Sequence, residues 1–187
     1  MRVEAFSDGV MAVVITIMVL GLKPPHSGDP SALVALLPSF AIYLVSFFLT
    51  AIYWINHHML IAQARRVTTG LLWANIGLLF CASLIPFATA YVAETRLAAF
   101  PTAVYAGLQC ACGLAFNALF RTIETQRDDQ AFRRGARIRR RQNFFAVAVY
   151  ALATVVALFR PIVALLLFTA VALAYVAPTS FDAGRER

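Results

Sequence analysis

The stretch RVEAFSDGVMAVVITIMVLGL, residues 2–22, joins a charged beginning to a long apolar run. Arg2, Glu4 and Asp8 lie in its first third, and no further charge follows before Leu22. About twenty apolar residues are what a helix needs to cross a bilayer. An ionisable group inside such a span is costly unless it is paired, and it marks a functional or architectural site. The stretch therefore predicts a membrane-spanning helix with a polar site near one end.

The composition of the whole chain is that of a membrane protein. Of its 187 residues, 61% are hydrophobic and only 13% are charged, whereas soluble domains are about 25% charged. We therefore expect an all-α membrane protein with one transmembrane domain over residues 1–187. Pro38, Pro86 and Pro161 are positions at which its helices can break. The apolar stretches predict six spans: Phe6–Leu22, Leu33–Ile61, Leu71–Val92, Ala99–Phe120, Phe144–Phe159 and Ile162–Val176.

Positive charge is distributed unevenly between the predicted loops. With the N-terminus inside, 13 of the 16 Lys and Arg residues fall on the cytoplasmic side, and Lys23, Arg96 and Arg160 fall outside. Cytoplasmic loops retain positive charge, so both termini are expected in the cytoplasm and the protein in the cell (inner) membrane, as a multi-pass protein. Eight of the arginines lie in a basic cytoplasmic loop, which we predict at about residues 121–143.

This basic segment includes FRRGARIRRR, residues 132–141, a composition also compatible with nucleic-acid binding. Topology alone places such a loop between two spans, so no nucleic-acid partner is expected, and a contact with anionic lipid is the commonest additional role. The N-terminus also begins like a signal peptide, but Ser7 and Asp8 interrupt that pattern. An uncleaved first span is the better interpretation.

No metal or cofactor site is expected. The three cysteines Cys81, Cys110 and Cys112 all lie inside predicted spans, which indicates packing residues rather than disulfides or metal ligands. Neighbouring His57 and His58 point about 100° apart on a helix and do not easily share one ion.

The first span presents two different faces when it is placed on a helix of about 100° per residue. Asp8 lies about 140° from Val13 and therefore belongs to another face. One apolar stripe is centred near Val13, and its other members are Gly9, Thr16, Ile17 and Leu20.

Polar residues of three predicted helices fall at the same depth as Asp8, in the inner third of the membrane. A hydrogen-bonded network is a natural way to satisfy such groups in lipid. Its expected members are Ser7, Asp8, Trp54, His57, His58, Trp73 and Asn75. The network is interpreted first as a lock between helices. The alternatives are a proton-sensitive switch and a secondary transporter that uses Asp8 and His57 as a proton relay.

These residues also carry a family resemblance. The start of the first span resembles the Arg-x-x-x-Phe-Ser-Asp signature of the transmembrane protein 175 family, matched here by Arg2, Phe6, Ser7 and Asp8. The segments WINHHML from Trp54 and LLWANIGLLFCASLIPFATAY from Leu71 are similar to the second and third helices of the family. The family includes bacterial and lysosomal potassium channels.

The resemblance implies a six-helix subunit and a homotetramer whose pore is lined by the first helix. It places the constriction at Val13, with Ile17 and Leu20 as further hydrophobic rings and Thr16 as a hydroxyl layer, while the signature network supports this helix from behind. It further implies a channel permeable to potassium and other monovalent cations, with modest selectivity and no cofactor. The family commonly has Ile or Leu where this chain has Val13, so Val13 and Ile17 both stay candidates for the tightest ring.

Two features that the sequence lacks bear on the expected mechanism and class. The sequence contains no TVGYG-like stretch that would replace hydration water with stacked backbone carbonyls. It also offers no nucleophile and base pair or metal-ligand spacing that would indicate an intramembrane enzyme.

Overall fold

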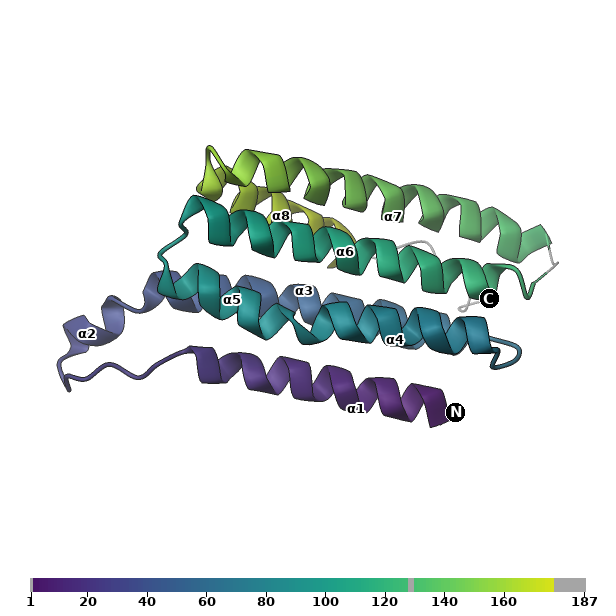
Figure 1. Cartoon of the computed structure of the whole chain (residues 1–187), viewed down its shortest axis with the longest axis horizontal. Coiled ribbons are helices and arrows are strands. Elements are labelled where there is room, and N and C mark those ends of the chain that lie inside the picture. The colour runs from purple at the N-terminus through teal and green to yellow at the C-terminus, as the bar shows by residue number, and fades with distance from the viewer. Residues whose placement is uncertain (1, 128–129, 177–187) are drawn as a thin grey trace.

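The structure is a computed structural model and describes residues 2–127 and 130–176. The chain runs to and fro along one long axis, so that its helices lie side by side in an elongated bundle (Figure 1). The elements are α1 (Arg2–Ile17), the 3-10 helix η1 (Met18–Gly21), α2 (Pro30–Val34), α3 (Leu37–Ile61), α4 (Thr69–Ser83), α5 (Ile85–Glu94), α6 (Ala99–Glu124), α7 (Gln130–Ala157) and α8 (Pro161–Val176).

Four helical stretches of the described chain are long and apolar enough to cross a membrane. They are Arg2–Gly21, Leu37–Ile61, Thr69–Glu94 and Ala99–Glu124. They correspond to the first four predicted spans. The fifth predicted span forms the apolar second half of α7, and the sixth falls in α8, whose Pro161–Val171 part is a shorter apolar helix.

Prolines determine where several helices begin. Pro38 and Pro86 lie in the first turns of α3 and α5, and Pro161 is the first residue of α8. Proline lacks a backbone N–H and is tolerated in the first turn, where that group has no partner within the helix. The predicted second span Leu33–Ile61 is therefore divided between α2 and α3, and the predicted third span Leu71–Val92 is divided between α4 and α5 at Leu84.

The basic segment is helical, and the prediction of a loop at about residues 121–143 is wrong. Helix α6 continues to Glu124, and α7 already begins at Gln130. The sequence between Gln130 and Asn143 contains no proline and is rich in arginine, glutamine and alanine, which favour helix. The start of α7 lies at the same end of the bundle as the start of α1 (Figure 1), and the cytoplasmic location of that end stays a prediction. Charge alone says little about whether a segment is helical.

Helix α1 joins the bundle through one face. Its buried residues Ser7, Met11 and Val14 are followed by buried Met18 in η1, at the spacing of a single helical stripe. Met11 and Met18 belong to a core cluster that also contains residues of α3, α4 and α6, such as Leu71 and Leu119. Figure 1 shows α1 at the edge of the bundle, so the opposite face of α1 is not covered by any other part of the described chain.

Candidate functional site

The face of α1 that points away from the bundle carries the stripe predicted from helical periodicity. Val13, Ile17 and Leu20 are 54%, 46% and 77% exposed, and Gly9 and Thr16 are exposed as well. Exposed apolar side chains of this number on a single helix need either lipid or another protein surface. The subunit therefore presents a continuous apolar stripe with one hydroxyl in it.

Thr16 places that hydroxyl in a defined position. Its Oγ1 donates back to the carbonyl oxygens of Ala12 and Val13, at 2.9 and 3.1 Å. A hydroxyl that donates in this way still has oxygen lone pairs that can accept. The hydroxyl oxygen of Thr16 can therefore accept a hydrogen bond or contact a cation at the exposed face, while its proton stays bonded within α1.

Behind the stripe, a buried chain of hydrogen bonds connects α1 to α4 and α3. Asn75 Nδ2 donates to Ser7 Oγ at 2.9 Å, and Ser7 Oγ donates to the backbone oxygen of Val3 at 2.9 Å. Asn75 Oδ1 lies 2.7 Å from His57 Nε2. Because an amide oxygen can only accept, His57 Nε2 is the donor in this bond. Ser7, His57 and Asn75 are all fully buried, so the bonds of Asn75 to Ser7 and His57 are made away from water.

A second polar set joins α1 to α3 nearer the surface. Trp54 Nε1 donates to Asp8 Oδ1 at 2.9 Å. His58 Nδ1 lies 3.5 Å from Glu4 Oε1 and 3.7 Å from Asp8 Oδ2. Residues four apart share a helix face, so Glu4 and Asp8 on α1 meet Trp54 and His58 on α3. Glu4 was missed by the sequence argument, although its spacing of four from Asp8 indicates a shared face.

Three predicted members of the site do not join either set. Trp73 is 69% exposed, and Arg2 and Phe6 are exposed too. Trp73 stands two residues before Asn75 on α4, and residues two apart on a helix do not face the same way. The predicted depth of Trp73 was compatible with the network, but its direction is not.

The proposed relay pair is not directly joined. Asp8 is bonded to Trp54 and lies beside His58, whereas His57 is bonded to Asn75. Nor do the described residues contain a cluster of three or more His, Cys, Asp or Glu side chains that could hold a metal ion. The arrangement fixes the position of α1 by hydrogen bonds from two neighbouring helices.

We expect Trp54→Phe to weaken the attachment of α1. The change keeps the aromatic ring but removes the only N–H that the indole can donate to Asp8, and a hydrogen bond to a charged group contributes about 1.5–3 kcal/mol. The loss should be measurable as a lower free energy of unfolding of the purified protein in detergent. Trp73→Phe is the matched control, because Trp73 is exposed. An equal loss from both changes would contradict the role given to the Trp54 bond.

A shallow groove runs beside the exposed stripe, between α1 and the break that separates α4 from α5. Phe6, Gly9, Val13 and Ile17 line it from α1, and Ser83 and Pro86 close it from the other side. The fold and this site define the class of protein: a helical membrane protein that presents the apolar stripe of an edge helix, held from behind by buried polar groups.

Comparisons with known proteins identify the family. The sequence model of the family described as endosomal/lysosomal potassium channel TMEM175 matches residues 2–86, which include both polar sets and the stripe. A potassium channel of Chryseobacterium sp. (strain P1-3) is 35% identical over 177 residues, or 95% of this chain and 92% of that one. A potassium channel of Streptomyces collinus is 40% identical over 127 residues, or 64% of this chain and 62% of that one.

The three-dimensional comparison agrees. The crystal structure of a lysosomal potassium-selective channel TMEM175 homolog from Chamaesiphon minutus matches with a TM-score of 0.85, at 29% identity, over 94% of this chain and 95% of that one. The chain belongs to the TMEM175 family. The family and its bacterial relatives are ion channels of the membrane rather than enzymes.

Proposed function

We propose that this protein is a potassium-permeable, modestly selective cation channel in which four copies surround a central pore lined by α1. The observation that carries the proposal is the division of α1 into two faces. One face is buried and hydrogen-bonded through Ser7 to Asn75, while the other exposes Val13, Ile17 and Leu20. Relatives named as potassium channels support the choice of ion.

The inner half of the exposed face is suited to packing against a second copy. Ala5 and Gly9 are four residues apart, and a Cβ placed on Gly9 would meet nothing within 4 Å in the subunit. Small residues at this spacing let transmembrane helices approach closely. The groove lined by Phe6 and Pro86 lies next to Ala5 and Gly9, and it offers room for a helix of the second copy.

In the assembled channel, the stripe forms successive rings about one helical turn apart. Val13, Ile17 and Leu20 are apolar, so a narrow neck made of their side chains closes by expelling water and opens with a small widening. Thr16 adds a layer of hydroxyls between the rings, where its oxygen can replace part of the hydration shell of a cation. With no stacked carbonyl filter in the sequence, selectivity for potassium over sodium should be modest.

We further propose six spans in the cell membrane, with both termini in the cytoplasm. The start of α1, the turn between α3 and α4, and the start of α7 all lie at one end of the bundle (Figure 1). That end carries Arg65 and Arg66 and the arginines of α7. A cytoplasmic location of this end follows the rule that positive charge stays inside.

The proposal is tested by the reversal potential of the purified protein in a planar bilayer with potassium on one side and sodium on the other. We expect cation current with a reversal potential that favours potassium, from protein that native mass spectrometry shows to be a tetramer. Anion current, or coupled transport without a conductance, would contradict the channel. A stable dimer or monomer that conducts would contradict the pore assembly.

A further inference from the structure

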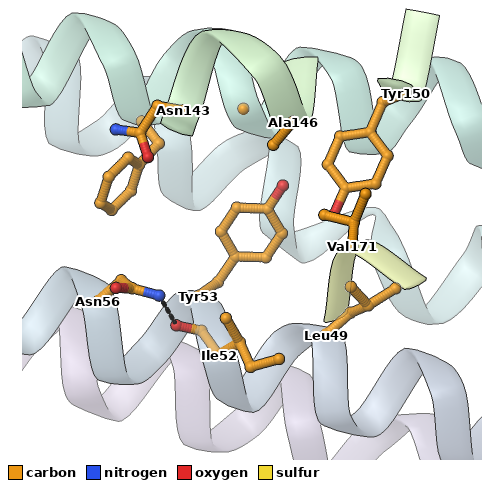
Figure 2. Close-up of a pocket in the computed structure, with 10 residues that line it drawn as sticks. Leu49, Ile52, Tyr53, Asn56, Asn143, Ala146, Tyr150 and Val171 are labelled. Atoms are coloured by element: carbon orange, nitrogen blue, oxygen red, sulfur yellow. Dashed lines mark hydrogen bonds between the residues drawn. The ribbon is translucent and has the colours of Figure 1, made fainter. Parts of the chain in front are cut away.

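Helix α7 packs into the bundle through one face only. Its buried residues recur at the spacing of a single helical stripe, and they include Ala136, Asn143, Ala146, Tyr150 and Ala153. Figure 2 shows Asn143, Ala146 and Tyr150 on the side of α7 that faces α3. The side of α7 opposite to this stripe is exposed in the described chain.

The exposed face of α7 changes in character along the helix. Its members recur at helical spacing, and they are Arg134, Arg137, Arg141, Phe144, Phe145, Ala148, Leu152 and Val155. The three arginines come first, the two phenylalanines follow, and aliphatic side chains make up the rest. A single helix face therefore passes from cationic through aromatic to aliphatic. We call it the outer face of α7.

The cationic part of the outer face has no counter-charge. Helix α7 contains six arginines and no aspartate or glutamate. Arg139 lies on the buried side and is engaged, since it donates to Asn56 Oδ1. Among residues 2–127 and 130–176, the guanidinium groups of Arg134, Arg137 and Arg141 form no ion pair or side-chain hydrogen bond. These three groups are therefore available to an anion from outside the chain.

The same arginines lie at the depth of lipid headgroups. From Gln142 to Phe159 the sequence has no charged residue, a helical length of about 27 Å that nearly matches the hydrocarbon core of about 30 Å. At 1.5 Å per residue, Arg141 and Arg137 precede Phe144 by about 4.5 and 10.5 Å. The headgroup layer on each side is about 5–8 Å thick, and a long arginine side chain can reach along the helix toward it. Arg141 therefore lies within that layer and Arg137 at its outer edge.

The outer face also points toward lipid in the assembly. Figure 1 shows α7 across the bundle from α1. This step rests on the proposed function: where α1 of each copy lines a central pore, the far side of the bundle forms the perimeter of the channel. The outer face of α7 then meets the surrounding bilayer along its whole length.

We propose that the outer face of α7 binds anionic phospholipid of the cytoplasmic leaflet, with phosphate groups at Arg141 and Arg137 and an acyl chain along Leu152. A guanidinium forms charge-assisted, bidentate hydrogen bonds with phosphate oxygens. The cytoplasmic leaflet carries the anionic lipids and attracts basic segments beside the membrane. The lipid lies on an exposed helix face and needs no cavity.

The preference for anionic lipid is measured by quenching of a tryptophan placed on the outer face. Leu152→Trp puts an indole about 12 Å from Phe144, near the middle of the acyl chains, and Ala148→Trp replaces it if that variant does not fold. The reporter protein is reconstituted in vesicles of equal parts phosphatidylglycerol and phosphatidylcholine, with bromine on the chains of one lipid only. The signal of the parent chain, which contains Trp54 and Trp73, is subtracted. We expect brominated phosphatidylglycerol to quench the reporter more, corresponding to a local preference of about tenfold.

Single arginine changes in the reporter protein locate this preference. Arg141→Gln should lower it to about threefold, because one of the two guanidinium groups at the headgroups remains. Arg66→Gln is the matched control: it removes the same charge at the same end of the bundle, but from the exposed turn between α3 and α4, away from α7 in Figure 1. Its effect should stay below about 1.5-fold, because charges farther away than a Debye length are screened.

Two results would overturn the proposal. Equal quenching by the two brominated lipids would show that the outer face does not select anionic lipid. Equal losses from Arg141→Gln and Arg66→Gln would show a diffuse effect of the whole basic end rather than binding at this face. The assay needs no ion conduction, and both leaflets of the vesicles have the same composition. Its outcome is therefore distinguishable from a failure of the channel proposal, which shows in the bilayer recordings.

Discussion

Val13→Asn and Ile17→Asn are expected to raise the resting potassium leak of liposomes that contain the protein. If the two side chains form rings around a pore, an amide in the neck holds water where an apolar side chain excludes it. A barrier lowered by about 1.4 kcal/mol gives a rate increase of about tenfold. The measurement is potassium efflux per reconstituted protein at equal lipid and protein amounts. The variant with the larger increase identifies the tighter ring, a question that the sequence leaves open between Val13 and Ile17.

The same substitution on a surface away from α1 is the control. Val155 of α7 is 57% exposed, close to the 54% of Val13, and it lies in the apolar half of α7, across the bundle from α1 in Figure 1. Val155→Asn should leave the leak unchanged, because an amide there faces neither a neck nor a pore. If neither substitution in α1 raises the leak, the pore is not lined by this face. A similar rise from Val155→Asn would indicate general damage to the bundle.

Periodicity and depth predicted different parts of the site with different success. The exposed stripe was predictable because its residues recur every three or four positions along α1. This spacing can be recognised from the sequence of a single helix, without knowledge of its neighbours. The contacts of Asn75 and Trp54 with α1 were expected because all three helices place polar residues at one depth, and polar groups in lipid need partners. Depth does not give direction, and that is why Trp73 was included although it points outward.

For the basic segment, the sequence predicts a location but not a backbone conformation. The arginines of α7 predict the cytoplasmic end through a rule about topology, and that rule does not depend on backbone conformation. Their helical conformation follows from the local preference of arginine, glutamine and alanine and from the packing of α7 against α6, and a count of charges considers neither. The hydrogen bond from Arg139 of α7 to Asn56 of α3, 83 residues apart in the sequence, likewise depends on how distant helices pack.

Asn75→Ala is expected to give the largest loss of stability among single changes in the polar support. Asn75 donates to Ser7 and accepts from His57, so its removal leaves two buried groups without their partner. An unsatisfied buried group costs about 1–3 kcal/mol, whereas hydrogen bonds between membrane helices average about 0.6 kcal/mol. We therefore expect a loss of about 2 kcal/mol, which should lower the midpoint of thermal unfolding by about 5 °C. Gln142→Ala, at an exposed amide of α7, should change the midpoint by less than about 1 °C.

A double-mutant cycle separates the hydrogen bond from the general loss of packing. Ser7→Ala alone removes the acceptor of Asn75 Nδ2, and the pair Ser7→Ala with Asn75→Ala should cost less than the two single losses added together, because both remove the same bond. The cycle is measured as unfolding midpoints in one detergent. Additive losses would mean that Ser7 and Asn75 act separately. The attachment of α1 would then depend mainly on the apolar contacts of Met11 and Val14, and the signature serine would not be needed to hold α1 in place.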